Sequence, residues 1–373
     1  MPSVPSDILA PIITLGSAIE SEWIRAGRDP LALPAIAVDA LTAAALQRQV
    51  SLSSLVSWGF QCPREQFPIQ GDPGAGFGEP PLTLWRGTQF RIDLLIWVDG
   101  SPDIHDHAFA GAFQVVEGGS LHGIYTFTPE RVFSPILRVG ALQRVGLERL
   151  GVGDVRPISP RAGLIHSLFH LQRPSATIVV RTNDTPDFAP QLVYLPPGLA
   201  CASYPTQLQA DPLYQRRLQL LVFYQRTGNM AFGDALWRMA DQADPAQLSA
   251  LLGYVFDTIA AGPGGVLDAA QQLSELLEST TARYPGLGAR LLPVFEQAHR
   301  RRILLSARGR IHDTELRLLL ALSIYAPDPP TLLSLVPSTD PRAWLQGALE
   351  RLSVVDGALA ASLRAAGMSG EGG

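Results

Sequence analysis

Five of the seven histidines in this 373-residue chain fall within one segment of about a third of its length. They are His105, His107, His122, His166 and His170. Imidazole is the commonest metal-binding side chain in proteins, so this concentration points to metal chemistry. On a strand, His105 and His107 would point to the same face, where two imidazoles can reach one ion. The run GLIHSLFH supplies a third ligand, and we predict one metal site at His105, His107 and His166.

Such a ligand set narrows the chemistry of the site. Neutral imidazoles suit iron, zinc, copper or nickel, and three of them leave open coordination positions for a substrate or dioxygen. Three neutral ligands also leave the ion with its full positive charge, which favours an anionic substrate donor such as a thiolate, carboxylate or enolate. An isolated His-x-His pair is common by chance, so the assignment depends on the sequence around it.

Three arginines are candidates to anchor an anionic substrate, because a guanidinium offers two parallel charge-assisted hydrogen bonds to a carboxylate. They are Arg86, Arg91 and Arg181, and Arg86 and Arg91 suit a surface position equally well. Tyr125 alternates with Gly123 and Phe127, which is typical of barrel packing, although its hydroxyl could also face a ligand.

The remaining polar residues of the segment have more ordinary interpretations. His170 follows His166 by four residues and suits either a hydrogen bond to a metal ligand or a place in the core. Asp106 is expected to face away from its two neighbours as an exterior or turn residue, and Glu117 to be a solvated turn residue. His122 is expected to be structural. Outside the segment, His299 and His312 are expected to be solvated helix residues.

The elements that must position these side chains change in character along the chain. Residues 7–26 and 34–57 show helical spacing of apolar residues, and the Gly- and Pro-rich stretch 63–81 predicts a loop. The strands that follow are expected at TQFRIDLLIWV, GAFQVVEGG, LHGIYTF, ATIVVRT and QLVYL. Past residue 211 the segments become Leu- and Ala-rich amphipathic helices. We therefore predict an α+β protein with N-terminal helices over 1–79, a β-barrel over 80–205 and an all-α region over 206–373.

The barrel segment resembles the cupin superfamily, and within it the thiol dioxygenases of the cysteine dioxygenase type. The first cupin motif is matched by Gly100, His105, His107 and Gly118, and the second by Pro160, Gly163, His166 and then His170 in place of an asparagine. The run FRIDLLIWVDGSPDIHDHAFAGAFQVVEGGSL is similar to the corresponding stretch of cysteine dioxygenase. The resemblance covers about 120 of the 373 residues. It implies a cupin barrel, a double-stranded β-helix or jelly roll.

Departures from the family are as informative as the matches. Most cupins carry a glutamate ligand where this chain has Gly111 or Ala112, so the resemblance implies the three-histidine ligand set of the thiol dioxygenases. Ala112 also stands where animal cysteine dioxygenases have a cysteine crosslinked to a tyrosine, so that crosslink cannot form. The family's Ser-His-Tyr set is replaced by Val179, Arg181 and Asn183. The identity of the substrate is therefore not transferred.

The leading interpretation is a mononuclear Fe(II) oxygenase that activates dioxygen beside a small anionic substrate, and the iron assignment comes from the resemblance. One alternative keeps the site but uses zinc, nickel or manganese for isomerisation, decarboxylation or hydrolysis. Another is a non-catalytic binding module whose C-terminal helices form a partner surface. Those helices could instead close over the barrel or form a homodimer interface.

Composition limits the partners. The net charge is −5 and 17% of residues are charged, which disfavours nucleic acid. The first 27 residues lack a basic segment and are broken by Pro11, Glu20 and Glu22, so they do not predict a signal peptide. No apolar run is long enough to span a membrane, and two cysteines make no disulfide framework. We expect a cytoplasmic protein.

Overall fold

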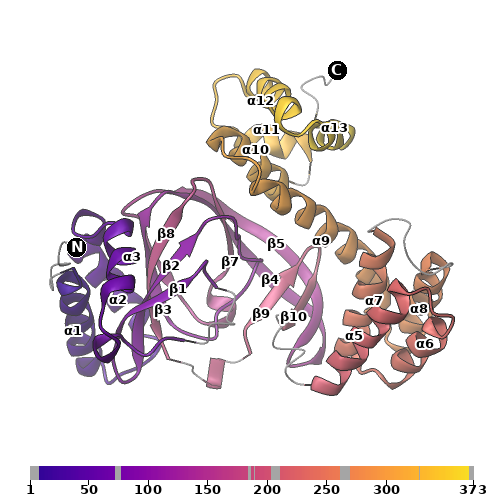
Figure 1. Ribbon diagram of the computed structural model, residues 1–373, viewed down its shortest axis with the longest axis horizontal. Coiled ribbons are helices and arrows are strands. Elements are labelled where there is room, and N and C mark those ends of the chain that lie inside the picture. Colours follow the sequence, from indigo (N-terminus) through magenta and orange to yellow (C-terminus); the bar gives the residue numbers. More distant parts are fainter. Residues whose placement is uncertain are drawn as a thin grey trace.

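The computed structural model describes residues 8–71, 77–183, 186–188, 190–202, 211–260, 269–326 and 328–368. Two antiparallel sheets face each other, with the N-terminal helices against one side of the barrel and the C-terminal helices beyond the other side (Figure 1). This is the α+β class predicted from the sequence. Among the described residues, no helix combines the length and the apolar character that a membrane span requires.

The N-terminal helices are α1 (Ala10–Arg25), α2 (Leu33–Ala44) and α3 (Leu52–Gln61). The prediction of one helix over 34–57 is wrong, because the backbone breaks between α2 and α3. Ala45 adopts a left-handed conformation with a φ of 46°, which ends α2. The Ser51 hydroxyl then accepts a hydrogen bond from the Ser54 backbone nitrogen and begins α3.

In the described part of the chain, ten strands form the two sheets. The first sheet has the order β1 (Pro81–Arg86), β2 (Phe90–Trp97), β8 (Ser175–Thr182), β3 (Gly111–Glu117) and β6 (Val155–Ile158). The second has the order β7 (Ile165–His170), β4 (Ser120–Ser134), β5 (Leu137–Leu150), β10 (Leu199–Ala202) and β9 (Leu192–Leu195). From β3 onward the chain passes back and forth between the sheets, which is the winding of a double-stranded β-helix. All five predicted segments are strands, namely β2, β3, β4, β8 and β9, whereas β1, β5, β6, β7 and β10 were not predicted.

Side-chain alternation along β8 separates the outer core from the interior of the barrel. Ala176, Ile178 and Val180 pack against the N-terminal helices in one apolar cluster. Thr177, Val179 and Arg181 point the other way and line a cavity inside the barrel. The two-residue period of a strand therefore places a cationic side chain in the interior.

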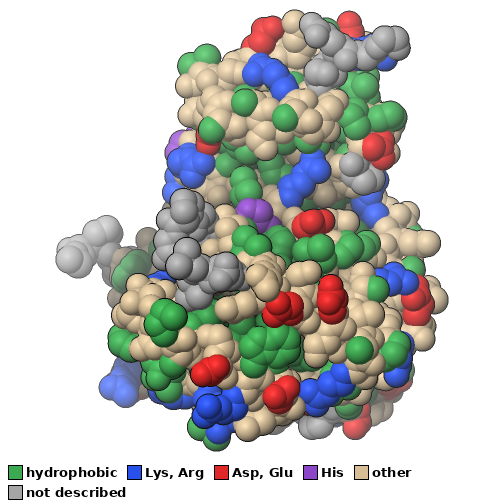
Figure 2. Space-filling view, turned by 90° about the vertical axis from the view of Figure 1, so that its right-hand side faces the viewer, with side chains coloured by type: hydrophobic (Ala, Val, Ile, Leu, Met, Phe, Trp, Pro, Cys, Tyr) green, Lys and Arg blue, Asp and Glu red, His purple; other side chains and the backbone are tan. Residues whose placement is uncertain are grey.

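The C-terminal helices form two groups connected by one long helix, α9 (Figure 1). Their bounds are α5 (Pro212–Arg226), α6 (Phe232–Gln242), α7 (Pro245–Ala260), α8 (Ala269–Arg283), α9 (Gly288–Arg308), α10 (Thr314–Tyr325), α11 (Pro329–Leu335), α12 (Pro341–Val355) and α13 (Gly357–Ala365). Helices α5 to α8 share a core with Leu137, Val139 and Leu199 of the barrel. Helices α10 to α13 share another core with Leu121 and Phe169. On the face shown in Figure 2, acidic and basic side chains are interspersed and neither sign forms a continuous patch.

A buried arginine joins α9 to the barrel. The Arg308 side chain is fully buried; its Nε donates to the His170 carbonyl at 3.0 Å and its Nη1 to the Gly100 carbonyl at 2.9 Å. Burial, followed by the nearby Arg317, lowers the pKa of Arg308 to about 10, so the side chain remains charged at neutral pH. The two hydrogen bonds fix the end of α9 against β7 and the loop after β2.

Replacing Arg308 by alanine should lower the free energy of unfolding by about 2 to 4 kcal/mol, because two buried carbonyls lose their donor. Removal of a desolvated charge offsets part of this loss. Arg302→Ala on the same helix is the control: it breaks a solvent-exposed pair with Asp257 and should cost no more than about 1 kcal/mol. Urea denaturation followed by circular dichroism measures both. Equal losses in the two variants would refute the anchoring role.

Candidate metal centre

His105 and His107 lie in the connection between β2 and β3, in irregular backbone rather than on the strand that was predicted. His105 exchanges two backbone hydrogen bonds of 2.9 Å with His166 of β7 and forms a second isolated bridge with Val193 of β9. His105 is the single residue of this segment that pairs with β7 and with β9, so the segment forms no regular strand ladder with either of them. The segment nevertheless joins β7 to β9, and both imidazoles still face the barrel interior.

Asp106 holds this segment in place. It is only 3% exposed, so its expected position on the exterior or in a turn is wrong. One carboxylate oxygen accepts from the Leu192 backbone nitrogen at 2.7 Å, and the other accepts from the Tyr194 hydroxyl at 2.9 Å. Burial raises the pKa of Asp106, while these two hydrogen bonds act in the opposite direction. The residue between the two histidines therefore fastens them to β9.

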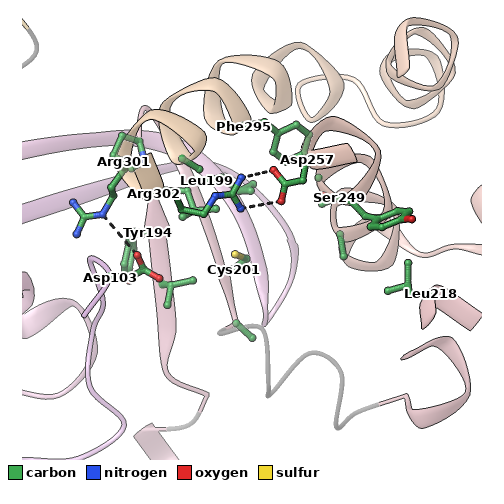
Figure 3. A pocket seen from close by; sticks show the side chains of 18 of the residues that line it. Asp103, Tyr194, Leu199, Cys201, Leu218, Ser249, Asp257, Phe295, Arg301 and Arg302 are labelled. Atoms are coloured by element: carbon green, nitrogen blue, oxygen red, sulfur yellow. Dashed lines mark hydrogen bonds and ion pairs between the residues drawn. The ribbon is translucent and has the colours of Figure 1, made fainter. Parts of the chain in front are cut away.

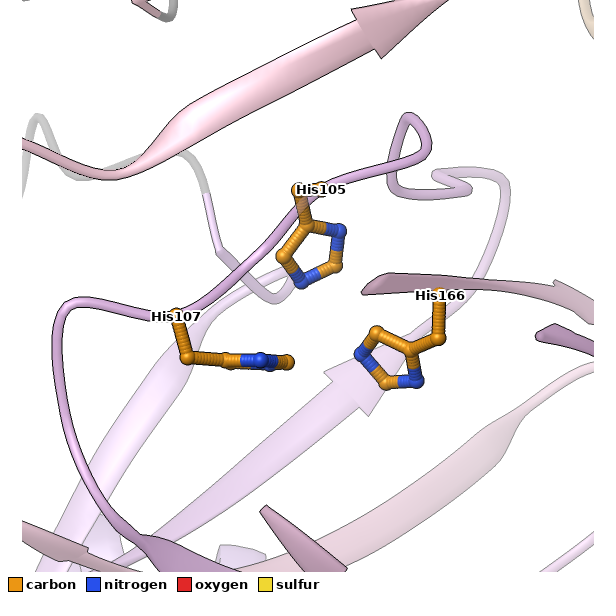
Figure 4. A group of neighbouring side chains, drawn as sticks. All are labelled: His105, His107 and His166. Carbon is orange, nitrogen blue, oxygen red and sulfur yellow. The ribbon is translucent and has the colours of Figure 1, made fainter. Parts of the chain in front are cut away.

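The structure brings the three predicted ligands together. The ring centroids of His105, His107 and His166 are 4.8 Å apart in every pair. One nitrogen from each ring lies within 4.8 Å of the other two, and all three residues are buried. Figure 4 shows the rings converging on a shared space, with two coming from the irregular loop and one from β7. In the described part of the chain this is the one cluster of at least three potential metal ligands.

Hydrogen bonds on the outer nitrogens orient two of the rings. His105 Nδ1 donates to the Asp103 carbonyl at 2.7 Å. The lone pair of its other nitrogen, Nε2, is therefore free to bind a metal ion. His166 Nδ1 lies 2.8 Å from His122 Nε2, and His122 Nδ1 lies 2.9 Å from a Glu148 oxygen. If His166 binds an ion through Nε2, its Nδ1 donates to His122, which in turn donates to Glu148.

Glu148 completes this relay as a carboxylate. Its oxygens accept hydrogen bonds of 2.9 and 2.6 Å from the Arg156 guanidinium. Chiefly because of Arg156, and also because of His122, the pKa of Glu148 is lowered to about 2. Glu148 therefore remains an acceptor at neutral pH. The residue hydrogen-bonded to His166 Nδ1 is thus His122, and not His170. His122 was expected to be structural.

Burial keeps the ligands neutral. It lowers the pKa of His105 to about 4 and lowers those of His107 and His166 well below the ordinary value. Neutral imidazole is the form that binds a metal ion. Three buried, neutral nitrogen donors that share one space fit iron, zinc or nickel. The positions where a cupin glutamate would stand, Gly111 and Ala112, lie on β3 and offer no side-chain donor.

The triad opens onto a cavity of about 70 Å³. Its walls are mostly apolar, including Leu95, Trp97, Phe109 and Phe113. Arg181 is the one cationic side chain among the described residues that line it, and its guanidinium lies 3.7 Å over the centre of the Phe109 ring. The site thus combines three metal ligands, one arginine and one carboxylate, that of Asp93, in a mostly apolar space.

The other two arginine candidates lie outside this cavity. Arg86 ends β1 and is exposed. Arg91 donates to an Asp93 oxygen at 2.9 Å, and Asp93 also accepts from the Thr83 hydroxyl at 2.7 Å. Asp93 itself lines the cavity. Of the three arginines, Arg181 is therefore the one placed beside the histidines.

His170 and Tyr125 take positions away from the triad. His170 faces the barrel interior, with its Nδ1 2.8 Å from the Ser120 hydroxyl and its ring stacked on Trp97. Tyr125 packs against the apolar cluster of α10 to α13 and does not line the cavity. Of the residues expected to be solvated, Glu117 and His312 are exposed and His299 is partly buried.

Loss of the outer hydrogen bond to His166 should weaken metal binding. We expect His122→Asn to lower metal affinity by about 10-fold to 100-fold, because His166 loses the partner that fixes its ring and raises its basicity. His170→Asn is the matched control, since it alters another buried barrel histidine that contacts no predicted ligand. Its metal affinity should stay within about twofold of the parent. Competition with a chromophoric chelator gives both values, and equal weakening would argue against a specific relay.

The solved structures to which the chain is similar include proteins of low sequence identity. No protein-family model and no curated protein matches the chain. The DMSP lyase DddQ from Ruegeria pomeroyi DSS-3 is 13% identical with a TM-score of 0.25, over 49% of this chain and 96% of that chain. Recombinant oxalate oxidase in complex with glycolate is 16% identical with a TM-score of 0.22, over 45% and 79%. Peruvianin-I, a cysteine peptidase from Thevetia peruviana latex, is 16% identical with a TM-score of 0.23, over 35% and 79%. Matches at this level assign neither a family nor an activity.

Proposed function

We propose that this chain is a mononuclear non-haem iron(II) oxygenase that acts on a small anionic substrate. The observation that carries the proposal is the composition of the site: three neutral imidazoles and an arginine around one apolar cavity. Iron(II), when bound, would supply open coordination positions and electrons for the activation of dioxygen. The choice of iron comes from the motif resemblance to cysteine dioxygenases.

Charge supports an anionic substrate. With only neutral protein donors, a bound divalent ion keeps its full charge and attracts a thiolate or carboxylate. Arg181 adds a second positive charge on the wall of the same cavity. Its stacking on Phe109 restricts the plane of the guanidinium, so it would hold the anionic group of the substrate in a defined orientation.

Size supports a small substrate. A cavity of about 70 Å³ is far below the roughly 300 to 1,000 Å³ of typical drug-sized ligand sites. The aromatic walls provided by Trp97, Phe109 and Phe113 exclude water and strengthen the electrostatic contacts inside. A thiol or hydroxyl carboxylic acid with a few non-hydrogen atoms fits these limits.

One observation favours a second candidate, a redox-neutral metal-dependent enzyme. Asp93 places a carboxylate on the wall of the same cavity, where it could accept a proton from a metal-bound substrate. Its hydrogen bonds to Thr83 and Arg91 hold it in position. Zinc, nickel or manganese would then replace iron.

Oxygen consumption separates the two candidates. Protein purified without oxygen and loaded with iron(II) should consume dioxygen only when a small thiol carboxylate or hydroxy carboxylate is added, with product formed in proportion. The panel should include the same molecules with the carboxylate amidated, which should fail. Substrate turnover without oxygen consumption would refute the oxygenase proposal and favour the Asp93 reaction. Turnover of neither kind across the panel would contradict both enzyme proposals and leave a binding module.

A further inference from the structure

A second cavity lies apart from the one at the histidines. It has a volume of about 660 Å³ and lies between the β9–β10 hairpin and helices α5, α7 and α9 (Figure 3). It shares no lining residue with the metal cavity. Its size falls within the range of ligand sites, in contrast to the small cavity inside the barrel.

Most of the wall is apolar and comes from both the barrel and the helices. Leu199 belongs to β10, Leu218 to α5 and Phe295 to α9, and small residues such as Gly253 and Ala298 leave the space open. This lining would accommodate the apolar body of a ligand. Burial of each methylene group in it would be worth about 0.8 kcal/mol, which is about fourfold in affinity.

Two ion pairs lie in the wall of the cavity, and their charges are not equally neutralised. Arg302 forms two hydrogen bonds with the Asp257 carboxylate, so the charges of these two residues neutralise each other (Figure 3). Arg301 is only 12% exposed, yet its Nε lies 3.7 Å from Asp103, whose side chain is 56% exposed. Arg301 Nη2 donates a long hydrogen bond of 3.4 Å to the Pro102 carbonyl, whereas its Nε is buried and has no hydrogen-bond partner. Arg301 is therefore a desolvated cation with a weak counter-charge.

We propose that this cavity binds an amphiphilic carboxylate, with its apolar chain between the hairpin and the helices and its carboxylate on Arg301. A carboxylate would supply the acceptor that the buried Nε lacks and neutralise the charge at close range. The proposal concerns a site separate from the metal centre and does not depend on the oxygenase reaction.

The site is connected to the metal ligands through two residues of its wall. The Asp103 carbonyl accepts the hydrogen bond from His105, and the Tyr194 hydroxyl donates to Asp106. Both Asp103 and Tyr194 line the large cavity. A ligand in this cavity therefore contacts the residues that position the His-x-His segment.

Calorimetric titration of the full chain with straight-chain carboxylates of six to twelve carbons tests the proposal. Affinity should increase about fourfold per methylene until the cavity is filled. Primary alcohols of matched length should bind at least tenfold more weakly. No saturable binding by any carboxylate up to its solubility limit would overturn the proposal, and equal affinity for the alcohols would overturn the role of Arg301.

Two variants and one control locate the ligand. Arg301→Gln should weaken carboxylate binding at least tenfold and leave alcohol binding unchanged, whereas Ala298→Phe should weaken both by filling the cavity. Arg300→Gln, which alters an exposed arginine on the same helix, should change neither. Full affinity in both Arg301→Gln and Ala298→Phe would place the ligand elsewhere and refute the site.

Cys201 gives a readout that does not require a cavity variant, because it lies in the cavity wall. In a Cys62→Ser background, its reaction with a thiol reagent should slow at least tenfold when the carboxylate saturates the protein. An unchanged rate at saturation would contradict occupation of this cavity.

Discussion

Replacing His166 by alanine is expected to lower the bound metal from about one ion per chain to less than about a tenth of that value. The ring of His166 is one of three that meet at centroid separations of 4.8 Å, and it is the one held by the His122–Glu148 relay. Two imidazoles alone bind a divalent ion too weakly to survive purification. His105→Ala and His107→Ala should have the same effect, measured by elemental analysis of protein prepared without added metal.

The control for this prediction is His299→Ala. His299 lies on α9 in contact with Phe256 and outside the triad, so its loss should leave the metal content unchanged. A His166→Ala protein that keeps full occupancy would remove His166 from the ligand set. Equal loss in His299→Ala would show that the assay reports general destabilisation and not ligation.

Replacing Arg181 by methionine is expected to lower kcat/KM for the anionic substrate by about 100-fold to 1,000-fold. Two charge-assisted hydrogen bonds to the substrate would be lost, a change of about 3 to 4 kcal/mol in transition-state binding. Methionine retains much of the apolar contact with Phe109, so the cavity wall is preserved. Steady-state oxygen consumption at varied substrate concentration gives the value.

Two accompanying measurements make the Arg181 result specific. Metal content should be unchanged in Arg181→Met, because Arg181 is not a ligand. Arg86→Met, which alters an exposed arginine at the end of β1, should keep parental kcat/KM. An Arg181→Met protein with parental activity would contradict the role of Arg181 as the substrate anchor.

Residue types and short sequence spacings were sufficient to predict the metal ligands of the site. His105 and His107 are brought to one cavity by a spacing of two, even though the backbone there is irregular. The hydrophobic β-rich runs predicted five strands because β-branched and aromatic residues lie between turn signals. His166 was predicted as the third ligand because its motif accompanies the first.

The contacts that could not be predicted from the sequence depend on the pairing register of strands that lie far apart in the chain. His122 contacts His166 because Ile124 of β4 pairs with His166 of β7, a pairing that short-range sequence patterns do not specify. The choice among the arginines likewise depends on tertiary contacts. Arg91 and Arg181 are direct cross-strand partners and so lie on the same face of the sheet, yet Arg91 pairs with Asp93 whereas Arg181 lies over Phe109 and lines the cavity. Asp106 was assigned to the exterior or a turn because it would face away from the two ligands on a strand. The strand that covers it, β9, lies almost 90 residues further along the chain.

The central claim is that one iron ion is held by His105, His107 and His166. Anomalous diffraction from crystals of anaerobically purified protein, recorded above and below the iron absorption edge, tests it most directly. We predict a single iron peak at bonding distance from all three imidazoles, with Arg181 facing it across the cavity. An iron peak at any other position, or no peak among the three rings in metal-loaded crystals, would contradict the claim.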